Sequence, residues 1–263
     1  MIYRLNKNKL MKTKALFILF LITVVSCNNS KQAKTTNQVN NKETITQKEI
    51  CWQGNINSKI PVFIHYQVKD SVVVGEIVYL NTKNKKPITL LGTIAPNNSC
   101  RLLEFAPTGT ITGIIEVNIN SSSCNGSWFS PNDKKELTLA LTSKDTVMAS
   151  KNIDSKNITG NYHYQYGKEG YNGDLDIELL PNGKATFEIM SLTEGSSPNI
   201  AEVEKDTITL KKNRFIYRLP DSDCAFEVIF YHNFAHIHYI NNACTNQFGM
   251  GATVEGIYLK TKK

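Results

Sequence analysis

From Cys51 onward, short runs rich in Val, Ile, Thr, Tyr and Phe alternate with clusters of Asn, Gly, Pro and Asp. Such runs, bounded by turn residues, predict short β-strands, and helical periodicity is missing nearly everywhere. Links of hairpin length, such as Lys69-Asp70 and Thr108-Gly109, make consecutive strands antiparallel neighbours. The sequence therefore predicts an all-β fold made of antiparallel meanders.

The first predicted β-domain covers residues 51–143 and contains eight predicted strands. They are residues 52–55, 60–68, 72–80, 88–94, 101–105, 110–118, 126–130 and 136–142. A meander of this many strands within about 95 residues suits a small barrel or sandwich. The residues that follow, up to Ser155, are polar and turn-prone, so we interpret them as a link.

The second predicted β-domain covers residues 157–263. Its predicted strands are residues 158–166, 174–180, 184–191, 201–204, 207–211, 215–219, 224–231, 235–240 and 254–260. Pro181-Asn182-Gly183 is a strong hairpin signal, because Asn-Gly accepts a positive φ at both central positions. Alternation places Leu175, Ile177 and Leu179 on the core face of their strand. We expect two small antiparallel barrels or sandwiches.

The N-terminal segment has the parts of a secretory signal. Lys12 and Lys14 precede an apolar run over residues 15–22, which leads into Val24-Val25-Ser26-Cys27. This ending resembles the lipobox of bacterial lipoproteins, and the resemblance implies that the Cys27 thiol is acylated and becomes the new N-terminus. The alternative is a transmembrane helix, but a span needs about 20 apolar residues and this run is shorter.

The resemblance implies an address as well as an anchor. Residues 1–26 would be a signal peptide, starting at Met1 or Met11, and residues 27–50 a flexible tether too polar to bury a core. Acyl chains on one cysteine hold a protein on a membrane, and the polypeptide itself does not cross the membrane. We therefore expect a lipoprotein of the bacterial cell envelope, on the periplasmic face or at the cell surface.

The formal charge of +7 does not indicate nucleic-acid binding. Five basic residues precede Cys27, and without them the excess of positive charge falls to two. The folded part has no basic stripe of the kind that nucleic-acid-binding proteins carry. We therefore exclude nucleic acid as a partner.

An exported protein meets an oxidising compartment, so disulfides are expected among the cysteines that follow Cys27. Cys224 and Cys244 are the only two in the second half and should pair. In the first half we favour Cys100–Cys124, which leaves Cys51 over, and Cys51–Cys124 is the competing pair. No Cys-x-x-Cys motif is present, so the sequence indicates neither a zinc knuckle nor a thioredoxin-like site.

Few residues suggest catalysis. His236 and His238 share one face of a strand, but no further ligand spacing completes a metal site, so we interpret them as part of a polar face. Glu104, within Leu102-Leu103-Glu104-Phe105, is the carboxylate placed to point into a barrel. Because neither a nucleophile elbow nor a phosphate-binding loop is present, we predict no catalytic residue, metal or cofactor.

Aromatic residues are the remaining lead. Tyr162, Tyr164 and Tyr166 lie on the same face of one predicted strand. Tyrosines on a face can stack on sugars or form a protein-binding patch. We predict this face as a possible binding surface, the alternative being a half-buried sheet face with hydroxyl groups at its rim.

Two stretches resemble small β-domains of exported bacterial proteins whose activity is not assigned. One runs from Ile88-Thr-Leu-Leu-Gly92 to Gly126-Ser-Trp128, and the other from Cys224 through Cys244 to Gly256-Ile-Tyr258. Neither resemblance implies a catalytic residue. Periplasmic lysozyme inhibitors are also small, lipid-anchored β-domains closed by disulfides, although their Ser-Gly-x-x-Tyr loop has no counterpart here.

We therefore expect a lipid-anchored, non-enzymatic binding or interaction module whose ligand is a protein or a glycan. One alternative is an inhibitor of lysozyme-like enzymes. The other is a hydrolase acting on glycan or lipid, which would need a pocket where Glu104 or the histidines His236 and His238 meet a second ionisable group.

Replacing Cys27 by alanine tests the anchor. The variant should move from the membrane fraction to the soluble fraction and lose label from radioactive palmitate, because the thiol that the lipobox resemblance marks for acylation is removed. Cell fractionation and labelling measure both effects, and a variant that stays as membrane-bound and as labelled as the parent contradicts the expectation.

Overall fold

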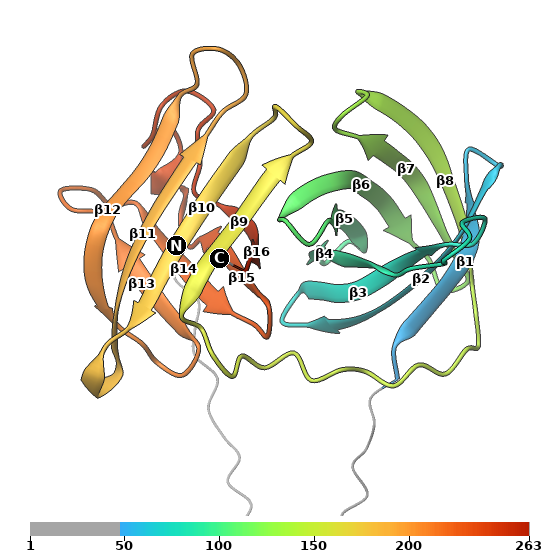
Figure 1. Ribbon diagram of the computed structural model, residues 1–263, viewed down its shortest axis with the longest axis horizontal. Coiled ribbons are helices and arrows are strands. Elements are labelled where there is room, and N and C mark those ends of the chain that lie inside the picture. The colour runs from blue at the N-terminus through green and yellow to red at the C-terminus, as the bar shows by residue number, and fades with distance from the viewer. Residues whose placement is uncertain (1–47, 263) are drawn as a thin grey trace, which may run out of the picture. The chain divides into compact units, whose positions relative to one another are not determined.

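The computed structural model describes residues 48–262, and within them the chain is almost entirely β-structure. Strands β1 to β8 span Ile50–Ile56, Ile60–Lys69, Val72–Tyr79, Ile88–Ile94, Ser99–Phe105, Thr110–Ile119, Ser123–Ser130 and Lys135–Ser143. Each strand pairs antiparallel with the next, and β8 pairs back with β1. The eight strands therefore close into a barrel (Figure 1).

The barrel has two buried faces. Its interior is filled by alternate residues of the strands, among them Trp52, Ile64, Leu90, Ile115 and Leu141. The outer face of β3 to β6 is also apolar and buried, and it belongs to a different hydrophobic cluster together with residues of the second half. Its members are Val72, Leu91, Leu103, Phe105, Ile111 and Ile114.

The second half is a further antiparallel meander (Figure 1). Strands β9 to β16 span Gly160–Tyr166, Asn172–Leu179, Lys184–Leu192, Ile200–Thr209, Arg214–Arg218, Ala225–Phe230, Phe234–Tyr239 and Gly256–Lys260. β16 pairs with β9, whereas among the described strands β12 pairs only with β11 and β13 only with β14. At the seam between β12 and β13, the Tyr217 hydroxyl donates to Asp206 Oδ2 at 2.8 Å.

A short parallel pairing of β6 with β9 connects the two halves. Thr110 pairs with Gln165 and Ile111 with Tyr166. The Gly167 amide also donates to the Ile111 carbonyl at 3.0 Å. The outer face of the barrel thus continues into the core of the second half, and the described part of the chain from residue 48 belongs to a single compact unit.

Two segments outside the strands, the residue before β1 and the link between the halves, are held against the outside of the barrel. His65 Nδ1 contacts Glu49 Oε2, and His65 Nε2 lies 3.4 Å from Glu76 Oε2. Lys151, in the link, donates to Glu76 at 2.7 Å. Glu49 and Ile50 therefore belong to the barrel, so the predicted tether extends too far at its C-terminal end; the signal peptide and Cys27 lie outside the described residues.

The predicted all-β class and the strands of the first half are confirmed. Predicted strands 201–204 and 207–211 are instead one strand, β12. Glu204 and Lys205 both lie opposite Glu188 in a β-bulge, so the pairing with β11 continues on either side of them. Asn182 and Gly183 have the predicted positive φ values of 66° and 72°. Leu179, which the alternation predicts on the core face, lies instead at the end of β10 and is exposed.

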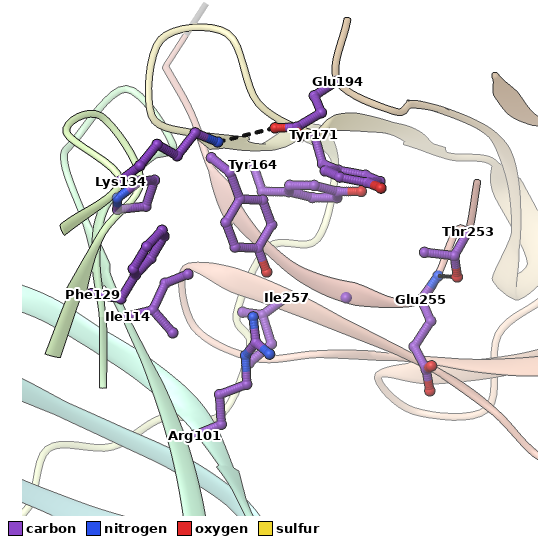
Figure 2. A pocket seen from close by; sticks show the side chains of 13 residues that line it. Arg101, Ile114, Phe129, Lys134, Tyr164, Tyr171, Glu194, Thr253, Glu255 and Ile257 are labelled. Carbon is purple, nitrogen blue, oxygen red and sulfur yellow. Dashed lines mark hydrogen bonds and ion pairs between the residues drawn. The ribbon is translucent and has the colours of Figure 1, made fainter. Parts of the chain in front are cut away.

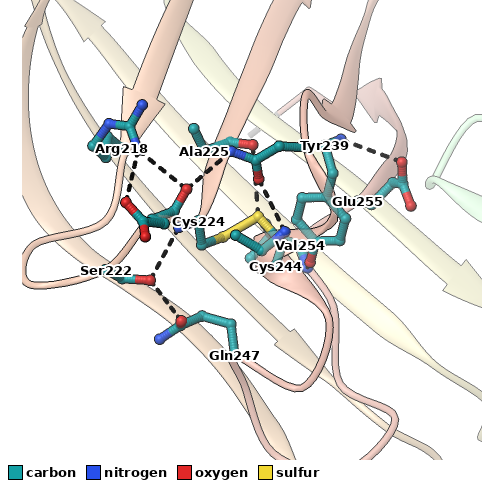
Figure 3. The surroundings of a disulfide bond; sticks show 12 residues. Arg218, Ser222, Cys224, Ala225, Tyr239, Cys244, Gln247, Val254 and Glu255 are labelled. Atoms are coloured by element: carbon teal, nitrogen blue, oxygen red, sulfur yellow. Dashed lines mark hydrogen bonds and ion pairs between the residues drawn. A yellow bond between two sulfur atoms is a disulfide. The ribbon is translucent and has the colours of Figure 1, made fainter.

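One predicted disulfide is confirmed. Cys224 and Cys244 are bonded, as Figure 3 shows, and the bridge joins the residue just before β14 to the loop between β15 and β16. The same loop is held by a hydrogen bond of 2.6 Å from Ser222 to Gln247. No helix among residues 48–262 is long and apolar enough to span a membrane.

The predicted Cys100–Cys124 bridge is wrong for this structure, in which both thiols are free and buried. Cys100 lies on β5 and Cys124 on β7, with β6 between them. Two strand spacings amount to roughly 10 Å, whereas a disulfide needs Cα atoms within about 7 Å. The competing Cys51–Cys124 pair is not formed either, because Cys51 lies on the opposite face of β1 from Trp52, which points into the barrel.

Replacing Cys224 and Cys244 by serine should lower the free energy of unfolding by about 3 kcal/mol, because the bridge closes a loop of 20 residues in the unfolded chain. Denaturant unfolding under non-reducing conditions measures this loss. A reductant should destabilise the unsubstituted protein and leave the variant unchanged. Equal sensitivity of both proteins to the reductant would be inconsistent with a stabilising bridge.

Candidate functional site

A pocket of about 360 Å³ opens between the barrel and the second half. Figure 2 shows that Phe129 and Ile114 of the barrel form one wall. Tyr164 and Tyr171 face them from the second half, with Ile257 of β16 below. The walls are therefore mainly aromatic and aliphatic, and they come from segments far apart in the sequence.

Tyr164, one of the aromatic residues that line the pocket, is fixed by contacts with other side chains of the second half. The Tyr164 ring packs edge-on against Tyr166 at 5.8 Å and against Tyr258 at 4.8 Å between centroids. Ser191 Oγ lies 3.5 Å from the Tyr164 hydroxyl and 3.2 Å from that of Tyr258, which donates to the Val254 carbonyl at 2.8 Å. Burial raises the pKa of Tyr164 to about 12, so the ring stays neutral at physiological pH.

Charged side chains of both signs surround the mouth of the pocket. Lys134 of the barrel donates to Glu194 of the second half at 3.1 Å, and Figure 2 shows this ion pair beside the aromatic rings. Arg101 and Glu255 lie on the other side, and the Tyr239 amide donates to Glu255 at 3.3 Å. Exposed ion pairs contribute at most about 1 kcal/mol, so a ligand can replace them at low cost.

The predicted binding surface of three tyrosines is only partly present. Tyr162 is fully buried, packs against Phe230 and donates its hydroxyl to the Ile158 carbonyl at 2.8 Å. Tyr164 is also a core residue, with 4% of its area exposed, because this face of β9 points into the second half. Tyr166 is half-buried and lines the pocket.

Sequence reasoning missed Tyr171 and Phe129 as parts of this site. Tyr171, in the turn after β9, is 38% exposed and presents its ring to the pocket. Phe129 lies on the barrel strand β7. Tyr171 lies close in sequence to the three tyrosines of β9, so this cluster of tyrosines indicates its position near the site. No local sequence pattern indicates that Phe129, in the first half, lies near the same site.

Glu104 points into the barrel. Its Oε1 accepts hydrogen bonds from the Tyr79 hydroxyl at 2.8 Å and from Trp128 Nε1 at 2.7 Å. Gly113 on β6 leaves room for this group, since a Cβ atom there would lie 2.6 Å from both Glu104 Cδ and Trp128 Nε1. Burial raises the pKa of Glu104, and the two donors only partly oppose this effect. The carboxyl is therefore a buried acceptor whose partners are a phenol and an indole.

His236 and His238 stack on one face of β15 with ring centroids 5.2 Å apart. Burial lowers the pKa of His236 to about 4, so its ring is neutral at physiological pH. His238 Nε2 lies 3.4 Å from Glu227 Oε2. Within residues 48–262, no group of three or more potential ligands is arranged to hold a metal ion.

Comparison with known proteins found no match to a family model, to a curated protein or to a solved structure.

Glu104→Gln should change how stability depends on pH. Because burial raises the pKa of Glu104, the folded state binds this proton more tightly than the unfolded chain, in which the carboxyl titrates near pH 4.5. The free energy of unfolding should fall as the pH rises above that value, by about 1.4 kcal/mol for each pH unit by which the pKa is raised.

Glutamine cannot ionise and keeps an oxygen acceptor for Tyr79 and Trp128, so the variant should lose this decline. Denaturant unfolding at a series of pH values measures the difference, with Glu116→Gln on the exposed side of β6 as the matched control. Parallel pH profiles for the Glu104→Gln variant and the unsubstituted protein would show that Glu104 does not titrate in this range.

Proposed function

We propose that this protein is a lipid-anchored, non-enzymatic binding module of the bacterial cell envelope, and that its ligand occupies the pocket between the two halves. The observation that carries the proposal is the pocket itself, in which aromatic walls are combined with a few charged groups at the mouth. Ligand sites are typically concave, apolar and preformed, with a small number of polar groups that orient the ligand.

The size and walls of the pocket favour a particular ligand chemistry. A volume of about 360 Å³ is near the lower end for small-molecule sites, so it suits one ring with its substituents. Tyr171 and Phe129 offer flat apolar surfaces, while Lys134, Glu194 and Arg101 offer donors and acceptors at the rim. A sugar ring of an envelope glycan has this chemistry, since its C–H face is apolar and its hydroxyl groups are polar.

The proposed anchor supports such a role. Acyl chains on Cys27 would hold the chain on the membrane. Binding at the envelope needs no catalytic group. A hydrolase is less well supported, because Glu104 meets Tyr79 and Trp128 rather than a second carboxylate.

Tyr171→Ala should weaken the binding of N-acetylglucosamine oligomers at least about fivefold, as expected for the loss of an aromatic residue that lines the site. Calorimetric titration measures the affinity. Ile216→Ala is the matched control, because Ile216 is an exposed apolar residue on β13 outside the pocket. Equal losses in both variants, or no binding of any oligomer by the unsubstituted protein, would argue against a glycan site here.

A further inference from the structure

A second pocket, of about 560 Å³, lies where three segments meet: the turn between β2 and β3, the link between the halves, and the turn between β12 and β13. It shares no lining residue with the pocket between the barrel and the second half, which is lined by Phe129 and Tyr171 and is called the aromatic pocket below. The geometry points to an oxyanion site here, which takes a phosphate group either free or as part of an ester.

The charge of this second pocket is mainly positive, and we call it the cationic pocket. Four cationic side chains line it against two carboxylates, Asp70 and Asp154. Two of the cations are paired, Lys69 with Asp154 at 2.5 Å and Arg214 with Glu227 at 3.3 Å.

The other two cations, Lys156 and Lys212, have no ion-pair partner within residues 48–262. Their ammonium groups outnumber the one carboxylate, Asp70, that likewise lacks an ion pair in this part of the chain. The site therefore has positive charge that its own residues do not compensate.

Two hydroxyl groups of the same pocket lack a hydrogen-bond partner. Within the described residues, only three buried side-chain polar atoms have none, and two of these are the Tyr231 hydroxyl and Ser155 Oγ. Both residues line this pocket. Burying a hydroxyl without a partner costs about 1–3 kcal/mol, so such groups are normally satisfied by protein, water or ligand.

The Tyr231 side chain is held in place independently of any ligand. It is 2% exposed, and its ring stacks on Phe234 at 4.5 Å. Burial raises the pKa of Tyr231 to about 12, so the hydroxyl keeps its proton and remains a donor. The neighbouring link is fixed by a β-bridge between Asp154 and Tyr231, so Ser155 and Lys156 directly follow a residue paired with Tyr231.

These groups match one class of ligand. Two lysines without an ion-pair partner and two residues with unpartnered buried hydroxyls line the same pocket. A phosphate presents several strong acceptor oxygens with negative charge. The phosphate can belong to a soluble ester or to a lipid headgroup, because both present the same oxygens. This inference does not depend on the aromatic pocket or on its ligand.

Calorimetric titration of the full chain with inorganic phosphate tests the site. Lys156→Gln combined with Lys212→Gln should weaken binding about tenfold, and the effect should shrink at high salt, because exposed charges are screened. Lys135→Gln, on β8 outside the pocket, is the matched control and should change nothing. Unchanged affinity in the double variant, or no phosphate binding by the unsubstituted protein, would overturn the inference.

Tyr231→Phe separates a ligand contact from a structural one. The variant should bind phosphate about fivefold more weakly. Its melting temperature in phosphate-free buffer should not fall, because the hydroxyl has no partner in the protein. A lower melting temperature with unchanged phosphate affinity would show that the hydroxyl is satisfied within the protein, for example by a trapped water, and would contradict its role as a ligand donor.

A last measurement identifies the source of the phosphate. Hydrogen exchange of the Ser155–Lys156 amides is followed in phosphatidylcholine nanodiscs, with and without phosphatidylglycerol. Inorganic phosphate is then added to the nanodiscs that lack phosphatidylglycerol. Exchange that slows when phosphatidylglycerol is present, without added phosphate, supports the site with a lipid headgroup as its ligand. Exchange that slows only when phosphate is added supports the site with a soluble ligand. No slowing in either case would count against the site.

Discussion

The packing of the barrel's outer face on the second half is the contact on which the rest of the structure depends. A barrel normally buries its interior and leaves its outer surface to solvent, but here Leu103, Phe105 and Ile114 on the outside are buried as well. An apolar strip of this kind has to be covered. The second half covers it, and the pairing of β6 with β9 sets the register of the two halves.

Both proposed ligand sites lie along this junction. The aromatic pocket combines Phe129 of the barrel with Tyr171 of the second half, and the cationic pocket combines Lys69 with Lys212. The interior of the barrel is occupied by its own side chains, including the hydrogen-bonded group of Glu104, Tyr79 and Trp128. Both candidate sites therefore combine residues of the barrel with residues of the second half.

The link between the halves takes part in the structure. Lys151 is tied to Glu76 on the barrel, and Asp154 forms a bridge with Tyr231 on the second half. The link also supplies Ser155 and Lys156 to the cationic pocket. A segment that sequence analysis interprets as a connector thus positions the residues of one candidate site.

Local sequence determined the strands, the Asn182-Gly183 turn and the bridge between Cys224 and Cys244, because alternation, turn preference and the only available partner are readable within short stretches. Alternation divides a strand into two faces, but it does not say what covers each face. Only the tertiary structure decided that Tyr162 and Tyr164 lie in the core, that β6 separates Cys100 from Cys124, and that Phe129 meets Tyr171. These outcomes depend on barrel closure and on contacts between distant segments, which no short stretch of sequence encodes.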